Sequence, residues 1–196
     1  MTDALYITSD ETRGLATAGE YVEAVREGYR QVGAGAPAEP RTQLTGRDPP
    51  GLLTAYIAIL PETGAMGGYT YAAGFGDRDA HFVTPLFDAE SGAPLAVLDG
   101  AHMNPYKTGA VGAVGTDVLA RPDATTLAMI GSGSQARGQL RAIDAVRDLE
   151  RVDVYSPTKE NREGFASEMN GQVAPTVAAV ASSAAAVEGA YIVVTA

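Results

Sequence analysis

The stretch Thr126–Ile143, TLAMIGSGSQARGQLRAI, constrains the fold of this chain more than any other segment. An apolar run leads into a glycine-rich turn and then directly into a segment with apolar residues at helical spacing. Gly131, Gly133 and Ala136 form the pattern G-x-G-x-x-A at the junction. Small residues at these positions permit a tight turn and close packing of helix on strand, so the stretch predicts the start of a βαβ unit.

The rest of the chain after Arg121 repeats the same alternation. Strands are predicted at TLAMI, RVDVYS, QVAPTV and AYIVVT, and helices at SQARGQLRAIDAVR, TKENREGFASEM and VASSAAAVEG. Repeated βα units imply a parallel sheet covered by helices. The predicted fold class is therefore α/β, with a partial Rossmann-type doubly wound parallel sheet over residues 121–196.

The first part of the chain has a different pattern of predicted helices and strands. A short strand at Leu5–Ile7 precedes a helix that starts at a capping box formed by Thr17 and Glu20. An extended segment EPRTQL and strands at LLTAYIAIL, AMGGYTYAA, HFVTPLFD and PLAVLD follow. A second helix is predicted with Asn104 as cap, Pro105 at its first position and its end near Ala120. Residues 1–120 are thus expected to form an α+β domain.

Composition excludes several classes of protein. The formal net charge of −10, from 14 basic and 24 acidic residues, argues against a nucleic-acid partner. No apolar stretch is long enough to cross a bilayer, and the N-terminus lacks the features of an export signal, so a cytoplasmic protein without a membrane partner is expected. The chain has no cysteine, and its two histidines, His81 and His102, show no ligand spacing, so no metal site is predicted.

The glycine-rich turn predicts a dinucleotide site. Free amide groups and the positive dipole end of the helix that starts at Ser134 suit a pyrophosphate. The expected cofactor-binding residues at this turn are Gly131, Gly133, Ser134, Gln135 and Ala136. The alternative is an ordinary turn between strand and helix without a ligand.

The end of the second predicted strand favours NADP over NAD. An NAD site usually has a carboxylate there, which binds the ribose hydroxyls. This chain has SPTKENR, with Ser156, Thr158, Lys159 and Arg162, while Asp153 lies inside the strand, two residues too early. Hydroxyls and cations suit a 2′-phosphate, although Lys159 and Arg162 can also be an ordinary solvated helical turn.

Lys107 is predicted in the first turn of its helix, where the helix dipole disfavours a cation. A bound anion reverses that preference, so Lys107 is a candidate for binding a substrate carboxylate, with a solvent-facing lysine as the alternative. The small residues behind it indicate close packing of this helix on another backbone: Gly109, Ala110, Gly112, Ala113 and Gly115.

Two consecutive stretches, PLFDAESGAPLAVLDGAHMNPYKTGAVGAVGTDVLA and TLAMIGSGSQAR, resemble the ornithine cyclodeaminase and mu-crystallin family. The resemblance runs from LYITSDET to AYIVVTA. It implies a homodimer in which residues 1–120 form a substrate and dimerisation domain and residues 121–196 an incomplete nicotinamide-binding domain. It also implies a small amino acid or its imine as substrate and NADP or NAD as cofactor.

The resemblance assigns roles residue by residue. Arg41 stands where the family has an arginine that binds the substrate carboxylate, and Lys107 replaces a second arginine, so its charge is kept but the bidentate fork is lost. Tyr69 occupies the place of the usual catalytic lysine. Thr108, Ser134 and Gln135 match the cofactor-binding segments, and Ser156 replaces an NAD-selecting aspartate. Thr195, at the end of the last predicted strand, completes the predicted cofactor-binding set.

These features favour an oxidoreductase that transfers hydride between the nicotinamide of NADP and the α-carbon of a small amino acid or imine. Lys107 and Arg41 would bind the carboxylate, and Tyr69 would donate a hydrogen bond or transfer a proton in place of the lysine. Tyr71 is interpreted as a packing residue on the opposite strand face from Tyr69. The alternatives are a non-enzymatic protein that binds NADP or a small ligand, and an inactive truncated fragment.

Overall fold

The computed structural model describes residues 4–75 and 80–196. The chain forms two compact units. Unit 1 consists of residues 1–15 and 27–104, and unit 2 of residues 16–26 and 105–196. These units divide the chain near Asn104, whereas the functional boundary proposed from the sequence, between residues 120 and 121, stays a prediction. Among the described residues, no helix is long and apolar enough to cross a membrane.

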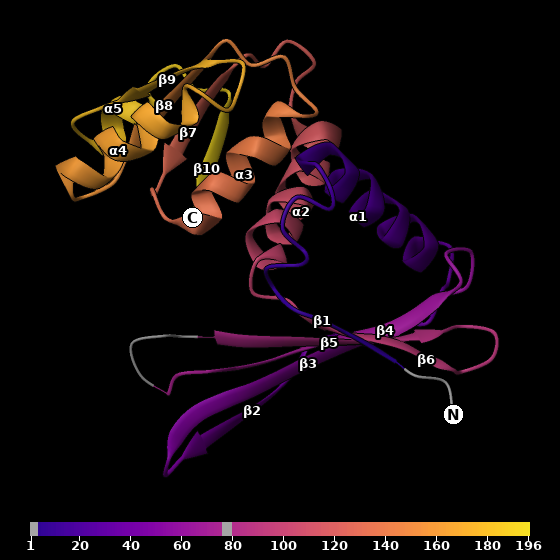
Figure 1. Ribbon diagram of the computed structural model, residues 1–196. Helices are drawn as coiled ribbons and strands as arrows, with labels where there is room; N and C mark the ends of the chain where they lie inside the picture. Colours follow the sequence, from indigo (N-terminus) through magenta and orange to yellow (C-terminus); the bar gives the residue numbers. More distant parts are fainter. Residues whose placement is uncertain (1–3, 76–79) are drawn as a thin grey trace. The chain divides into compact units, whose positions relative to one another are not determined.

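Unit 1 is built on a six-stranded mixed sheet (Figure 1). Its strands, in spatial order, are β1 (Leu5–Ile7), β6 (Pro94–Asp99), β5 (Ala80–Asp88), β4 (Ala65–Ala73), β3 (Pro50–Leu60) and β2 (Thr42–Arg47). β1 runs parallel to β6, and the other neighbours are antiparallel. The strands predicted from the sequence are confirmed, as is the hairpin loop between β5 and β6, where Asp88 N–H donates to Ala93 O over 2.9 Å.

The register of β3 and β4 separates two kinds of side chain. Tyr56 is paired with Tyr69, and their neighbours Ile57 and Gly68 are paired with each other. Because successive residues of a strand point to opposite faces, the tyrosines lie on one face of the sheet and Ile57 on the other. The sheet therefore presents an aromatic face and an aliphatic face.

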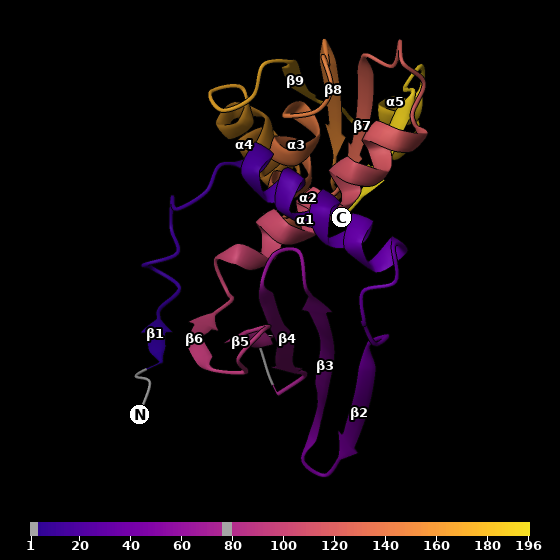
Figure 2. The same cartoon turned by 90° about the vertical axis from the view of Figure 1, so that its right-hand side faces the viewer.

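Unit 2 contains a four-stranded, all-parallel sheet in the order β10-β7-β8-β9. The strands are β7 (Thr126–Ile130), β8 (Arg151–Tyr155), β9 (Thr176–Ala179) and β10 (Ile192–Thr195), connected by helices α3 (Ser134–Asp144), α4 (Lys159–Met169) and α5 (Ser183–Val187). Since β10 returns to the other side of β7, right-handed connections place α5 on the opposite face from α3 and α4, as Figure 2 shows. This confirms the predicted partial Rossmann-type sheet.

The core of unit 2 is an apolar cluster around the parallel strands. Leu127, Met129, Val152 and Val154 from β7 and β8 are each at most 1% exposed and pack with Phe165 of α4. Successive residues in the middle of β7 and β8 are all buried, because helices cover both faces of this sheet. A strand with one face in solvent would instead alternate buried and exposed residues.

Helix α1 (Ala18–Gly33) starts at the predicted capping box. The backbone N–H of Thr17 donates to the Glu20 carboxylate over 2.7 Å, and Glu20 N–H donates to Thr17 Oγ1 over 3.2 Å. Val22, on the first half of α1, is fully buried in the core of unit 2. The capping box therefore holds the start of a helix whose apolar side closes that core.

Helices α2 (Met103–Leu119) and α3 pack with their backbones in contact. A Cβ atom built on Gly109 would overlap the backbone carbonyl of Gly138, and one on Gly138 would overlap the carbonyl of Pro105. The Nε2 of Gln139 donates to the carbonyl of Thr108 over 3.3 Å. The expectation that the small residues of α2 serve close packing is confirmed, and this packing fixes α3 against α2.

Several element boundaries differ from the sequence prediction: α3 ends at Asp144, α5 is limited to Ser183–Val187 and β10 starts at Ile192, and two further differences have a clear local cause. α2 starts at Met103, so Asn104 lies inside the first turn and does not cap the helix; its N–H donates to Gly100 O over 3.0 Å. β9 starts at Thr176 and not at Gln172, because Gln172 N–H still bonds back to the end of α4, at Met169 O. In both places the backbone hydrogen bonds of a local turn set the boundary, and the side-chain pattern alone does not predict them.

We predict that Gly109→Ala destabilises the protein by about 1–3 kcal/mol, since its methyl group has no room against the backbone of α3. Gly115→Ala is the matched control on the same helix: nothing lies within 4 Å of its added Cβ. This control should be neutral or stabilising by up to about 1 kcal/mol. Urea unfolding of the two variants measures both effects. Equal losses of stability would contradict the backbone contact of α2 with α3.

Candidate functional site

The turn after β7 needs a glycine at its first position. Gly131 has φ +125°, a conformation that residues with a side chain rarely adopt. A Cβ atom there would also overlap the carbonyl oxygen of Ala196, beside β10. The Gly131 N–H donates to Tyr155 O over 2.8 Å. The turn is therefore held between its two neighbouring strands, at the point where the connections from the sheet change direction.

Gly133 opens the N-terminus of α3. It is the N-cap residue, and no side chain makes a capping hydrogen bond there. A Cβ built on Gly133 would find nothing within 4 Å, and Gly133 and Ser134 are both exposed. The first amide groups of α3 can thus be approached by an anion, whose charge the helix dipole stabilises. The carboxyl ends of parallel strands at such a change of direction are where open α/β sheets bind ligands.

Neighbouring side chains support this turn. Arg137 Nη1 donates to the carbonyls of Ser132 and Gly133 over 2.5 and 3.2 Å, and its Nε donates to Glu168 over 2.8 Å. Ala136 is fully buried, as the third small residue of the pattern requires. Among the described residues, Gln135 Oε1 is a buried acceptor without a hydrogen-bond partner. The open amides and this acceptor fit a ligand with both acceptor and donor groups, as a dinucleotide has.

In the segment after β8, some polar residues form hydrogen bonds that hold the loop, and others are exposed to solvent. Ser156 is 6% exposed, and it accepts a hydrogen bond of 2.9 Å from the Ser132 hydroxyl, which connects the turn after β7 to the turn after β8. Arg162 donates to the carbonyls of Ser156 and Pro157 over 3.0 and 3.3 Å. Both residues therefore shape the loop.

The exposed residues of this segment are Pro157, Thr158, Lys159, Glu160 and Asn161. Thr158 is the N-cap residue of α4, and its side chain makes no capping hydrogen bond. The Lys159 side chain is 66% exposed, and its Nζ lies 3.7 Å from Glu163. Asp153 lies inside β8 and pairs with Arg151 over 3.0 Å. No carboxylate stands at the end of β8 itself, and the first turn of α4 exposes the Thr158 hydroxyl and the Lys159 ammonium group together with the Glu160 carboxylate.

Arg41, Tyr69 and Tyr71 lie close together on the aromatic face of the unit 1 sheet. Arg41 Nη1 donates to Tyr71 Oη over 3.4 Å, and the Tyr69 and Tyr71 rings are 6.2 Å apart. The prediction that Tyr71 faces away from Tyr69 is wrong, because residues two positions apart in a strand share a face. Tyr56 and Phe82 complete the aromatic group, each with its ring 5.4 Å from that of Tyr69.

Tyr69 is held by hydrogen bonding as well as by packing. Its side chain is 9% exposed, and its Oη donates to Asn104 Oδ1 over 3.0 Å. Burial, together with the neighbouring phenols of Tyr56 and Tyr71, raises the pKa of Tyr69 far above its ordinary value. The phenol is therefore uncharged at any physiological pH.

Lys107 is the fifth residue of α2, because the helix starts earlier than the sequence predicts. The unfavourable dipole effect is confined to the first turn and is thus smaller than expected there. Lys107 is half-buried, and desolvation lowers the pKa of its ammonium group.

Other predicted positions are placed as follows. Thr195 ends β10 in register with Ile130, beside the turn at Gly131. His81 is exposed at the start of β5, and the backbone N–H of His102 donates to Ser9 Oγ over 2.9 Å. No cluster of potential metal ligands exists among residues 4–75 and 80–196.

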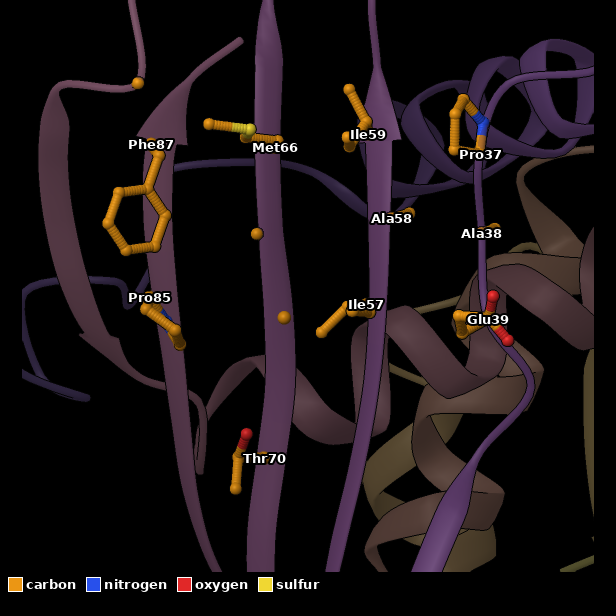
Figure 3. Close-up of a pocket in the computed structure, with 13 residues that line it drawn as sticks. Pro37, Ala38, Glu39, Ile57, Ala58, Ile59, Met66, Thr70, Pro85 and Phe87 are labelled. Atoms are coloured by element: carbon orange, nitrogen blue, oxygen red, sulfur yellow. The ribbon is translucent and has the colours of Figure 1, made fainter.

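The aliphatic face of the unit 1 sheet carries a shallow cavity of about 560 Å³ (Figure 3). Ile57, Ile59, Met66 and Phe87 line it, and the carboxylate of Glu39 lies at one side of the group in the view. Large apolar side chains on this face remain 36–67% exposed: Leu44, Leu53, Ile57, Ile59, Val83 and Phe87. A contiguous exposed apolar surface of this kind is typical of protein interfaces.

Sequence reasoning missed the role of Asn104, which it interpreted as a helix cap. The Pro105 that follows it made a cap plausible. The available signal was the spacing of Tyr69 and Tyr71, which places both phenols on one face of their strand. The hydrogen bond itself depends on tertiary structure and has no local sequence pattern.

Comparison with known proteins agrees with this geometry. A Δ1-pyrroline-2-carboxylate reductase from Bacillus cereus is 37% identical over 139 residues, which cover 71% of this chain and 40% of the reductase. The structure of the Thermococcus litoralis Δ1-pyrroline-2-carboxylate reductase in complex with NADH and L-proline superimposes with a TM-score of 0.87 at 27% identity, covering 97% of this chain and 61% of that one. An archaeal alanine dehydrogenase dimer with bound NAD gives 0.82 at 27% identity, covering 91% and 56%.

The chain thus spans about 40% of the length of the curated reductase and about 60% of the solved structures. The profile of the ornithine cyclodeaminase/mu-crystallin family matches residues 4–196. This match covers nearly the whole chain and agrees with the mixed sheet, the parallel sheet and the glycine-rich turn between β7 and α3. The chain belongs to the ornithine cyclodeaminase/mu-crystallin family.

Proposed function

We propose that this chain binds NADP and a small amino acid or its imine as part of an oxidoreductase of its family. The observation that carries the proposal is the turn from Gly131 to Ser134, where the uncapped first amides of α3 are open to solvent at the carboxyl ends of β7 and β10. The relatives that superimpose on the chain hold NADH or NAD, which supports the same ligand class here.

The pyrophosphate of the cofactor would lie against Gly133, Ser134 and the backbone of α3. Gly133 allows this approach because it has no Cβ, and Gln135 and Thr195 lie on the elements that border the turn. Bound NADP would accept or donate the hydride, while the protein orients the reactants and provides charge.

NADP is proposed over NAD because of the segment after β8. The 2′-phosphate of NADP would meet Thr158 and Lys159, which are exposed, on a loop shaped by Ser156 and Arg162. NAD binding usually relies on a carboxylate at the end of this strand, and this chain has none there.

Arg41 and Lys107 are proposed as cationic partners of a substrate carboxylate. Arg41 lies on the aromatic face of the unit 1 sheet, next to Tyr71, and Lys107 lies half-buried on α2; each is proposed from the family resemblance and from its positive charge. Thr108 follows Lys107 on α2 and is assigned to the cofactor by the family resemblance. The substrate class is a small molecule with a carboxylate and a nitrogen on its α-carbon.

A homodimer is proposed through the aliphatic face of the unit 1 sheet. Two copies of this face would bury the exposed side chains of Leu44, Leu53 and Ile57 against each other. Sheets that pack face to face interdigitate such side chains about 10 Å apart. The alanine dehydrogenase relative is described as a dimer, which supports this assembly.

A non-enzymatic binder remains the second candidate, since Tyr69 brings no positive charge where the resemblance implies a catalytic lysine. Both candidates bind NADPH. Only an enzyme oxidises NADPH when it is supplied with a cyclic imine, or with pyruvate and an amine source. The absorbance of NADPH therefore separates the enzyme from the binding protein.

For cofactor binding, we predict that Gly133→Ala leaves the free energy of unfolding within about 0.5 kcal/mol, since the added methyl group meets open space. The same methyl group would weaken NADPH binding by at least about tenfold, by separating the pyrophosphate from the amides. Fluorescence titration with NADPH measures the affinity. Gly164→Ala on α4, also in open space, is the control. Unchanged affinity in Gly133→Ala would remove the turn from the cofactor site.

For cofactor selectivity, Lys159→Gln should weaken NADPH binding by about tenfold and leave NADH binding nearly unchanged, because only NADPH carries the phosphate that the ammonium group would bind. Arg13→Gln, an exposed charge change in unit 1, serves as control. A parallel loss of both affinities would show that Lys159 does not select the 2′-phosphate.

For assembly, Ile57→Asp should convert a dimer to monomers, because a buried unpaired carboxylate at the interface is costly. Ile57 is 58% exposed in the single chain, so the substitution spares the core. Val118→Asp on α2, at a position 69% exposed, is the matched control. Sedimentation velocity reports the mass, and a dimer that survives Ile57→Asp would place the interface elsewhere.

A further inference from the structure

Arg137, the fourth residue of α3, reaches back to the turn that precedes its own helix. Its Nη1 donates to the carbonyl oxygens of Ser132 and Gly133 over 2.5 and 3.2 Å. The carbonyl of Gly133 also accepts the backbone N–H of Arg137 over 3.3 Å, so both of its acceptor positions are used. One side chain therefore fixes two consecutive peptide groups of the turn.

Fixing these two carbonyls also fixes the two amides that follow them. A trans peptide group is planar, so its C=O and N–H point in opposite directions. Both peptide bonds of Gly133 are trans. With the carbonyls of Ser132 and Gly133 turned toward Arg137, the next amides point away from it. These are the N–H groups of Gly133 and Ser134, two exposed residues at a helix start that no side chain caps.

The guanidinium group is anchored within unit 2. Its Nε donates to Glu168 Oε2 over 2.8 Å, and its Nη2 lies 2.7 Å from the same oxygen. The ring of Phe165, which is fully buried, lies 5.3 Å from the guanidinium carbon. The hydrogen bond from Arg137 lowers the pKa of Glu168, so this pair is ionised at neutral pH. A guanidinium group whose charge is compensated in this way is suited to holding the backbone of the turn.

We propose that Arg137 is a positioning residue of the cofactor site: by holding two carbonyls of the turn, it presents the N–H groups of Gly133 and Ser134 to the pyrophosphate of NADPH or NADH. This role rests on the proposed function and deepens it, because it names the side chain that prepares the turn before the cofactor binds. Amides that are already oriented reduce the cost of ordering the turn on binding. Since both cofactors carry the pyrophosphate, Arg137 contributes equally to the binding of each.

The first test needs no ligand. In protein labelled with carbon-13 and nitrogen-15, an HNCO spectrum connects each amide N–H with the carbonyl carbon of the preceding residue. The Gly133 and Ser134 signals therefore report the two carbonyls that Arg137 bonds. Arg137→Met keeps an unbranched side chain beside Phe165 but donates no hydrogen bond, so it should move both carbonyl signals upfield.

Arg141→Met is the matched control. Arg141 lies one turn further along α3, with its Nη2 3.5 Å from Glu168 Oε1, and its side chain is 23% exposed, against 26% for Arg137. It donates to Gln172 Oε1 and not to the turn. The control removes the same charge from the same helix, and it should leave both carbonyl signals in place.

The second test measures cofactor binding in the same variants by fluorescence titration. Arg137→Met should weaken the binding of NADPH and of NADH by the same factor, about tenfold, the contribution of one or two hydrogen bonds. Arg141→Met should leave both affinities close to those of wild type. Arg137→Lys, which keeps N–H donors, should be intermediate in carbonyl shift and in affinity, and it provides the same comparison if the methionine variant does not fold.

The outcomes separate this inference from the proposed function. Carbonyl signals that stay in place in Arg137→Met, or move equally in Arg141→Met, overturn it. A loss of affinity without a carbonyl shift would assign Arg137 to direct contact with the cofactor, and a shift without a loss would show that the turn needs no positioning; either result overturns the inference, as does a loss confined to NADPH. If wild type binds neither cofactor, the proposed function fails together with the ligand part of the inference, while the HNCO spectrum still decides whether Arg137 holds the two carbonyls.

Discussion

The turn between β7 and α3 is the constraint on which unit 2 depends. Gly131 adopts a positive φ while it lies against the backbone of Ala196, and its N–H bonds to Tyr155, so the chain leaves β7 in one direction only. That direction sends α3 across α2, where Gly109 and Gly138 allow the two helix backbones to touch. The result is a helix start with open amides at the carboxyl ends of the strands.

Unit 1 follows a simpler principle, the alternation of side chains along antiparallel strands. In β3 and β4 this alternation sorts phenols to one face and aliphatic side chains to the other. One face therefore offers hydrogen-bonding groups and an arginine, and the other offers an exposed apolar surface.

The sequence was sufficient for features that depend on local chemistry. The G-x-G-x-x-A turn, the Thr17–Glu20 capping box and the parallel strands are confirmed, because each follows from the conformations that its residues allow. Asn104 could not be assigned in this way. Its neighbour Pro105 suits a helix start, but its amide bonds to a strand distant in sequence. Ser156 likewise matched a cofactor position, and its hydroxyl proved to connect two turns within the protein.

The central claim is that a dinucleotide pyrophosphate binds the first amides of α3. The most direct measurement is a crystal structure, or amide NMR shifts, of this chain with NADPH. The account predicts phosphate oxygens within hydrogen-bond distance of the amides at Gly133–Gln135, or the largest shifts at these amides. NADPH bound elsewhere, with this turn unchanged, would contradict it.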